Sequence, residues 1–265
     1  MIDFGIYERD GFAVLEPIFS DDDLTAMRAA VDALHRRALG GKEPELSAAC
    51  VFEKVQPVRK RDGRELTDGQ DAVFILGDPT RFDPALLRFF VDTRLTGIVE
   101  QALGTANIVL HFANITTKAP VIGSGISWHR DFPNKYMCPA EPQMLRTMIC
   151  LDGMRAGSGA TAFLTGSHID GVSGNDIEEN DSRLVTAECA PGAIVAIHPL
   201  ALHGGAPNAS TLQRRNLVLQ WGIADYPLVT EARESVTGLR AAELMASVSA
   251  IELPERQTSP ADEAR

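Results

Sequence analysis

The sequence predicts one mainly β domain with flanking helices. It has 265 residues, of which 45% are hydrophobic, and this is enough to fill a single large core. Apolar residues at helical spacing lie mainly in the first hundred residues. After Gly104 the chain becomes a series of short runs, rich in β-branched residues and separated by Gly and Pro. Such runs indicate a β-sandwich or jelly roll rather than alternating βαβ units.

We expect the single domain to cover residues 1–252. Within it, residues 1–104 are helix-rich, residues 105–226 or thereabouts form the β core, and a helical segment follows. Residues 253–265, with the sequence "LPERQTSPADEAR" at this end of the chain, are polar enough to form a flexible tail.

Three segments define the helix-rich part. "GFAVLEPIF" reads as a short strand that ends at a turn. The helix that follows, in "SDDDLTAMRAAVDALHRRA", begins with Ser20 and Asp23 at the spacing of a capping box. "DPALLRFFVDTRLTGIVEQALG" predicts one or two amphipathic helices that end at Gly104. Between them, residues 51–70 are polar and broken by Pro57 and Gly63, which predicts a loop or a weak hairpin.

The β core is predicted from seven apolar runs of strand length. They are "NIVLHFANITTK", "GISWHRDF", "MLRTMICLDG", "TAFLTG", "RLVTAECA", "AIVAIH" and "RRNLVLQWGIA".

Charge and composition restrict the class of function. The net charge of -11 and the pI near 5.0 argue against nucleic-acid binding, which needs clustered Lys and Arg. The four cysteines form no regular framework, so we expect thiols in a reducing compartment. No stretch reaches the roughly 18 apolar residues of a membrane span, and the N-terminus lacks a leader pattern. We therefore expect a soluble cytoplasmic protein without a nucleic-acid or membrane partner.

Two His-x-Asp pairs are candidate metal ligands. His129 and Asp131 lie on or at the end of a predicted strand, where residues two apart share one face and can point at one ion. His168 and Asp170 lie instead in a turn-rich segment, where no shared face is guaranteed. We expect the first pair to bind metal and the second to be loop residues.

A second histidine would complete a site that suits Fe(II). Two histidines and one carboxylate leave positions open for a chelating cosubstrate and O₂. His111 lies inside a strand run and reads as a core residue, whereas His198 and His203 both lie near a Gly-rich turn. Arg214 follows eleven residues after His203, and its planar guanidinium suits a carboxylate. Arg214 and Arg215 can also be read as a solvated pair at a strand end.

Taken together, these segments resemble the phytanoyl-CoA dioxygenase-like group of Fe(II)/2-oxoglutarate oxygenases. The resemblance covers most of the chain and rests on "DGFAVLEPIFSDDDLTAMRAAVDAL", "NITTKAP", "SGATAFLTGSH" and "LHGGAPNASTLQRRNLVLQW". It implies a double-stranded β-helix core, the cupin-like jelly roll. It also implies that His129, Asp131 and His203 are the catalytic metal ligands. The usual Pro-Gly-Ser-His of the middle motif has Thr165 in place of proline, which affects a turn and not the metal site.

The resemblance further implies the cofactors Fe(II), 2-oxoglutarate and O₂. Arg214 matches the arginine that binds 2-oxoglutarate, and Thr116 and Thr147 match positions that line the cosubstrate pocket. The implied reaction releases succinate and CO₂ and usually hydroxylates the substrate. Related halogenases have a small residue in place of the acid, so Asp131 favours oxygenation.

The substrate is the least defined part of the prediction. Arg130 and Lys135 flank the metal motif, and the basic loop at residues 59–64 could cover the mouth of the site. These residues suit a small anionic metabolite or natural-product intermediate, although such a loop on an acidic protein can equally be solvated surface. Desaturation or epimerisation with the same cofactors is an alternative to hydroxylation. A non-catalytic cupin-like binding module and a different metal enzyme are alternatives of other classes, and the oligomeric state stays open.

Overall fold

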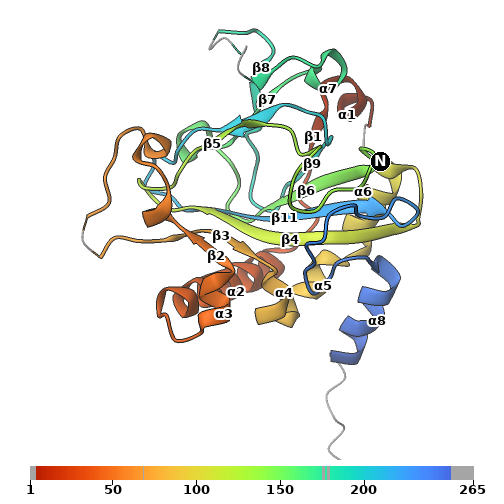
Figure 1. Cartoon of the computed structure of the whole chain (residues 1–265), viewed down its shortest axis with the longest axis horizontal. Coiled ribbons are helices and arrows are strands. Elements are labelled where there is room, and N and C mark those ends of the chain that lie inside the picture. The colour runs from red at the N-terminus through yellow and green to blue at the C-terminus, as the bar shows by residue number, and fades with distance from the viewer. Residues whose placement is uncertain (1–3, 68, 175–176, 178–179, 252–265) are drawn as a thin grey trace, which may run out of the picture.

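Two antiparallel β-sheets face each other, with most helices outside the larger one (Figure 1). This computed structural model describes residues 4–67, 69–174, 177 and 180–251. The eight-stranded sheet has the order β1-β9-β6-β11-β4-β3-β2, with β12 paired to β4, and the four-stranded sheet has the order β5-β10-β7-β8. The arrangement confirms the mainly β jelly-roll prediction.

The strands of the larger sheet are β1 (Phe12–Leu15), β2 (Cys50–Phe52), β3 (Val73–Gly77), β4 (Ile108–Lys118), β6 (Met144–Cys150), β9 (Ile194–Ile197), β11 (Arg214–Ile223) and β12 (Leu239–Arg240). Those of the smaller sheet are β5 (Ile126–His129), β7 (Thr161–Leu164), β8 (Leu184–Thr186) and β10 (His203–Gly205).

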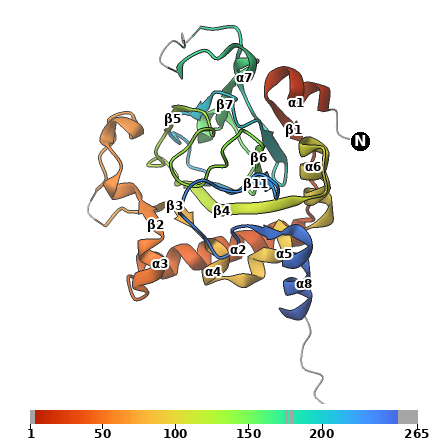
Figure 2. The same ribbon diagram turned by 45° about the vertical axis from the view of Figure 1, so that its right-hand side comes forward.

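The described α-helices are α1 (Phe4–Asp10), α2 (Asp21–Leu39), α3 (Pro44–Ala48), α4 (Pro79–Phe82), α5 (Leu87–Phe90), α6 (Thr93–Leu103), α7 (Ser167–Asp170) and α8 (Ala241–Ile251). Short 3-10 turns are η1 (Glu53–Val55), η2 (Val58–Arg61), η3 (Pro84–Leu86) and η4 (Ala156–Ser158). In two views, α2 to α5 and α8 lie against the outer face of the larger sheet (Figure 2).

Side chains along β11 point alternately to the two faces of the larger sheet, and each face borders a different interior. Leu217, Leu219 and Trp221 point to the helices and belong to the main apolar core, which also holds the buried face of α2. Arg214 and Asn216, on the other face, line a cavity between the two sheets. The larger sheet therefore has an apolar core on one side and a polar cavity on the other.

The predicted N-terminal elements are confirmed. Ser20 and Asp23 form the capping box of α2, in which each side chain bonds the other residue's backbone N–H. Helix α6 ends before Gly104, whose φ of 69° is a left-handed conformation that glycine adopts without strain.

Other parts of the prediction need correction. The described residues of 51–70 are not a plain loop: the segment begins in β2, which pairs antiparallel with β3, and continues through η1 and η2, so the hairpin alternative holds in part. The short strands β3 and β10 have no counterpart among the predicted runs, since three to five residues carry too little periodicity to be recognised. The predicted tail, residues 253–265, lies outside the described part of the chain.

The four cysteines are free thiols. No helix within the described residues is long and apolar enough to cross a membrane.

Candidate active site

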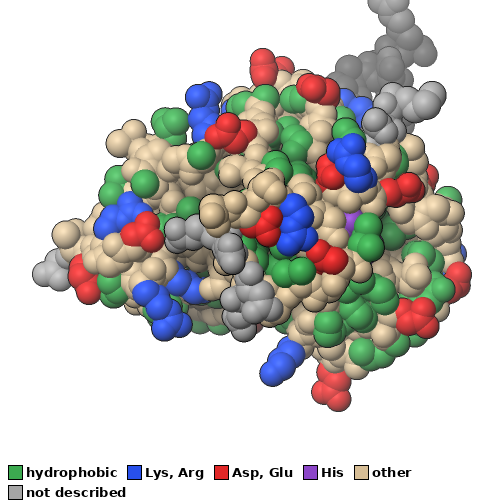
Figure 3. All heavy atoms as spheres, turned by 90° about the horizontal axis from the view of Figure 1, so that it is seen from above, with side chains coloured by type: hydrophobic (Ala, Val, Ile, Leu, Met, Phe, Trp, Pro, Cys, Tyr) green, Lys and Arg blue, Asp and Glu red, His purple; other side chains and the backbone are tan. Residues whose placement is uncertain are grey.

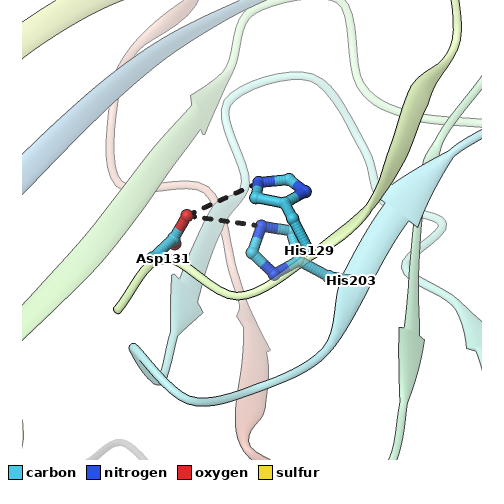
Figure 4. A group of neighbouring side chains, drawn as sticks. All are labelled: His129, Asp131 and His203. Carbon is cyan, nitrogen blue, oxygen red and sulfur yellow. Dashed lines mark ion pairs between the residues drawn. The ribbon is translucent and has the colours of Figure 1, made fainter. Parts of the chain in front are cut away.

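His129, Asp131 and His203 meet at one point of the cavity (Figure 4). The register of the smaller sheet explains this, because β10 pairs antiparallel with β5 and sets His203 opposite His129. The Nε2 atoms of His129 and His203 lie 3.6 and 3.7 Å from Oδ1 of Asp131, and the ligand atoms of all three lie within 4.8 Å of one another.

Asp131 reaches this point from outside the strand. Strand β5 ends at His129, and the backbone N–H groups of Asp131 and Phe132 both donate to the Pro199 carbonyl at 3.0 Å. The predicted convergence is correct, but a bend fixed by Pro199 produces it rather than strand alternation alone.

Both imidazoles are oriented for metal binding. Nδ1 of His129 lies 2.9 Å from the Ser127 carbonyl, and Nδ1 of His203 lies 3.0 Å from the Ala201 carbonyl. A carbonyl can only accept, so each Nδ1 carries the proton and each Nε2 presents its lone pair to the centre of the group. Backbone support of this kind fixes the tautomer of a metal-binding histidine.

The Asp131 carboxylate is buried and ionised. Burial by itself raises the pKa of Asp131, but the charge of Arg146, joined by that of His203 once it is protonated in acid, outweighs burial and lowers that pKa to about 2. Nη1 of Arg146 lies 2.5 Å from Oδ1, yet the angle is not that of a hydrogen bond, and within the described chain neither carboxylate oxygen accepts one. Burial, opposed by Asp131, lowers the pKa of His203 to about 4, so this imidazole is neutral at pH 7. Two imidazole Nε2 atoms that face a buried carboxylate, whose oxygens accept no hydrogen bond within the described residues, fit a divalent cation.

The three side chains adjoin a cavity of about 240 Å³ between the sheets. Its walls come from both sheets. The lining residues are Lys60, Phe74, Ile75, Asn114, Thr116, Lys118, Ile126, His129, Arg146, Met148, Thr161, Ile197, His203, Gly204, Gly205, Arg214, Asn216 and Val218.

Arg214 provides a buried cation in this cavity. With the Asn216 amide oriented to satisfy both its ends, its oxygen accepts from Nη1 of Arg214 at 2.6 Å. Nε of Arg214 is buried and has no partner among the described residues. Burial lowers the pKa of Arg214 to about 10, which still leaves the guanidinium charged. A buried charge without an acidic partner is costly, so this geometry suits an anionic ligand.

A sequence model of the phytanoyl-CoA dioxygenase family matches residues 7–216. The chain belongs to this family. The match includes the metal-binding group and Arg214, and it confirms the predicted family.

Curated relatives and a solved structure agree. The ectoine dioxygenase of Bordetella parapertussis is 28% identical over 61% of this chain, and the aligned part is 47% of that protein. The chain thus spans about half the length of the ectoine dioxygenases it matches. A protein of Stutzerimonas stutzeri, "Probable alpha-ketoglutarate-dependent hypophosphite dioxygenase", is 28% identical over 84% of this chain and 79% of its own. The crystal structure of EctD from S. alaskensis with bound Fe has a TM-score of 0.68 at 20% identity, and the match covers 85% of this chain and 77% of that one. This last likeness shows the fold.

The two threonines predicted for the cosubstrate pocket lie on different sides of the larger sheet. Thr116 lines the cavity, and its hydroxyl donates to Asn114 Oδ1 at 3.1 Å. Thr147 lies on the other face of β6, where its Oγ1 accepts from Nε1 of Trp221 at 3.0 Å in the helix-side core. This member of the phytanoyl-CoA dioxygenase family therefore does not bring Thr147 to the site.

Neither residue predicted to contact the substrate lines the cavity. The guanidinium of Arg130 donates to the carbonyls of Leu200, at 2.7 Å, and Ser167, at 2.8 Å, so it supports the backbone. Lys135 is exposed. These placements do not support the substrate role predicted for either residue.

The second His-x-Asp pair lies away from the metal site, as expected, but in a one-turn helix rather than a loop. Nε2 of His168 lies 3.0 Å from the Glu8 carbonyl, and Asp170 pairs with Arg183 at 2.5 Å.

Three basic residues of the loop at residues 59–64 lie in different environments. Arg61 is buried and pairs with the buried Glu53 at 3.7 Å, Lys60 lines the cavity, and Arg59 is exposed. Neither a simple lid nor plain solvated surface describes it.

Sequence reasoning missed five polar residues that line the cavity: Asn114, Lys118, Arg146, Thr161 and Asn216. It expected Lys60 only as part of a loop that could cover the mouth of the site. Two signals were available: Asn216 shares a strand face with Arg214, and Arg146 is a charge inside the apolar run "MLRTMIC".

Proposed function

We propose that this protein is an Fe(II)- and 2-oxoglutarate-dependent dioxygenase that hydroxylates a small molecule, with release of succinate and CO₂. The observation that carries the proposal is that the His129, Asp131 and His203 group and the buried Arg214 adjoin one cavity between the sheets. A metal hydrolase with three protein ligands would not need this arginine, because it has no cosubstrate carboxylate to bind.

His129, Asp131 and His203 would hold the iron. When bound, iron and 2-oxoglutarate supply the oxidising chemistry from O₂. The protein contributes the orientation of the ligands, through the Ser127 and Ala201 carbonyls, and a charge for the cosubstrate.

Arg214 would bind the distal carboxylate of 2-oxoglutarate. Its Nε lacks a partner within the described chain, and a bidentate carboxylate would satisfy it. Met148, Ile197 and Val218 give the same cavity an apolar wall.

The size of the cavity and the names of the relatives support a small substrate. The volume of about 240 Å³ lies below the roughly 300–1,000 Å³ of pockets for drug-sized ligands, and the cosubstrate would take part of it. The relatives are named for ectoine and for hypophosphite.

Anaerobic titration of the Fe(II) protein with 2-oxoglutarate tests the proposal. The chelate gives a weak visible charge-transfer band, and this band should appear in the wild type and require more 2-oxoglutarate in Arg214→Ala. Absence of the band in the iron-loaded wild type would favour a non-catalytic binding module or a different metal enzyme. Once a substrate is found, ¹⁸O₂ distinguishes the outcomes, since hydroxylation places the label in the product, whereas desaturation and epimerisation do not.

A further inference from the structure

Arg146 is a second arginine in the cavity, and it lies beside the metal-binding group. It comes from β6, on the same face as Met148, and its side chain is 18% exposed. Nη1 lies 2.5 Å from Oδ1 of Asp131. A group that binds this guanidinium from the cavity would therefore lie next to the metal.

The surrounding residues hold the guanidinium in place. Nε and Nη2 both contact Oε1 of Gln220 at 3.3 Å, and the charge lies 5.1 Å from the centre of the Phe112 ring. Gln220 is itself fixed, because its Nε2 donates to the Met137 carbonyl at 2.8 Å and lies 3.1 Å from Nδ1 of the buried His111. These contacts hold the Arg146 guanidinium in one orientation, as expected of a binding residue and unlike a mobile surface arginine.

Arg146 also has donors to spare. Of its five N–H groups, those on Nε and Nη2 that face Gln220 share one amide oxygen, and the contact with Asp131 lacks hydrogen-bond geometry. An anionic group with two or more acceptor oxygens on the cavity side could take the remaining N–H groups.

Charge balance indicates what this group is. In the loaded site, the two charges of Fe(II) are matched by Asp131 and by the carboxylate of 2-oxoglutarate that binds the metal, and Arg214 matches the other carboxylate. Burial lowers the pKa of Lys118 to about 6, so this amine is mostly neutral at pH 7, and it donates to the Gly159 and Ala206 carbonyls.

Two cations then remain, Arg146 and Lys60. Among the described residues that line the cavity, none is Asp or Glu. Lys60 comes from η2, which is fixed to the segment before β5 by a 2.6 Å hydrogen bond from Gly125 N–H to the Lys60 carbonyl. On the face of the molecule in Figure 3, acidic and basic side chains are mixed, so no charge of one sign dominates it.

We propose that Arg146, with Lys60 as a second cation, binds an anionic group of the substrate, such as a carboxylate, sulfonate or phosphonate. The inference rests on the proposed function and narrows its substrate class. Because Arg146 contacts a metal ligand, the anionic group would lie against the metal centre, and the oxidised atom would be close to it in the substrate.

Small anions can test this without knowledge of the substrate. The protein would be saturated with Co(II), which replaces iron without turnover, and with 2-oxoglutarate. Acetate, methanesulfonate and neutral acetamide would then be titrated by calorimetry and by the Co(II) visible spectrum. We expect the two anions to bind in preference to acetamide. Arg146→Met should weaken the anions about tenfold or more, as expected for a lost charge-assisted hydrogen bond.

Three variants serve as comparisons. Lys60→Met should cause a smaller loss, and Arg59→Met, which removes an exposed charge from the same loop, should cause none. Arg146→Lys keeps the charge but not the planar fork, and should fall between wild type and Arg146→Met.

The possible failures are distinct. Unchanged anion binding in Arg146→Met would mean that anions bind the metal directly, and would overturn the inference. Equal binding of acetamide and acetate would also overturn it. A loss of 2-oxoglutarate affinity in Arg146→Met as large as that in Arg214→Ala would assign Arg146 to the cosubstrate instead. If the wild type bound no 2-oxoglutarate, the proposed function itself would fail, and the inference with it.

Discussion

The two faces of β11 hold neighbouring arginines in opposite circumstances. Arg215, on the helix side, donates to Asp152 through Nε and Nη2, at 2.9 and 2.7 Å, and to Asp32 of α2 at 2.7 Å. Arg214, on the cavity side, donates to the Asn216 amide, and its Nε has no partner in the described part of the chain. The charge of Arg215 is thus paired within the protein, whereas that of Arg214 is left for a ligand. Unpaired hydrogen-bond donors, and not charge alone, therefore distinguish a binding residue from a structural one.

The largest effect should come from the cavity side. His129→Ala, Asp131→Ala and His203→Ala should each abolish iron-dependent turnover, because two remaining ligands seldom hold Fe(II). The fold should survive, since the apolar core lies on the helix side. Iron content and circular dichroism of each purified variant would check this. Full iron and activity in His203→Ala would transfer its role to His198.

The arginine pair tests the comparison directly. Arg214→Ala should weaken 2-oxoglutarate binding by about tenfold to a hundredfold, the value of a charge-assisted hydrogen bond of roughly 1.5–3 kcal/mol. Arg215→Ala should leave that affinity near wild type and instead lower the free energy of unfolding by about 1.5–3 kcal/mol, because it removes the partner of Asp32 and one of the two cationic partners of Asp152. Cosubstrate titration at saturating Fe(II) and urea unfolding would be run on both variants. Equal effects of the two substitutions on 2-oxoglutarate affinity would contradict the assignment of Arg214 to the cosubstrate and of Arg215 to the structure.

Acid should affect both sides alike. Burial lowers the pKa of His35, on the helix side, and of His111, on the cavity side, from 6.5 to about 4. Asp32 and Arg215 act on His35 in opposite directions and leave this shift in place. The unfolded chain therefore binds more protons than the folded protein between these values, and stability should fall as the pH falls from about 6.5 to 4.

The size should be on the order of 1 kcal/mol for each such histidine between pH 7 and pH 5. Urea unfolding of wild type and His35→Gln at the two pH values measures it. The variant should lose less stability than wild type on acidification, and an identical loss would contradict the assignment.

The smallest effect is expected far from both arginines. His168→Ala and Asp170→Ala should leave the iron content near wild type and cost about 1 kcal/mol of stability at most. Metal analysis of these variants beside His129→Ala makes the comparison. A loss of iron as large as that in His129→Ala would mean that the wrong His-x-Asp pair had been chosen.

The sequence allowed the fold class, the N-terminal capping box and the long strands to be predicted, because apolar periodicity and capping depend on local residues. Strands β3 and β10 were out of reach, since their pairing depends on partners distant in sequence. In the site, the metal-binding group and Arg214 were predicted from spacing and resemblance.

Thr147 shows what spacing could not give. Neighbouring residues of a strand point to opposite faces, so a shift of one residue moves a side chain from the cavity to the core. Only the register of β6 against β11 decides which face Thr147 takes. Arg146 and Lys60 needed the folded structure, because they reach the cavity from segments that no motif connects.

The metal-binding side chains and Arg214 also belong to different sheets. His129 and His203 are on the smaller sheet and Asp131 follows it, whereas Arg214 is on the larger one. A molecule that chelates the metal at one end and meets Arg214 at the other therefore acts as a cross-link between the two halves of the barrel. The gap between the sheets then selects this molecule by its length. A dicarboxylate one carbon shorter or longer would have to strain the packing of the barrel or give up one of its two attachments.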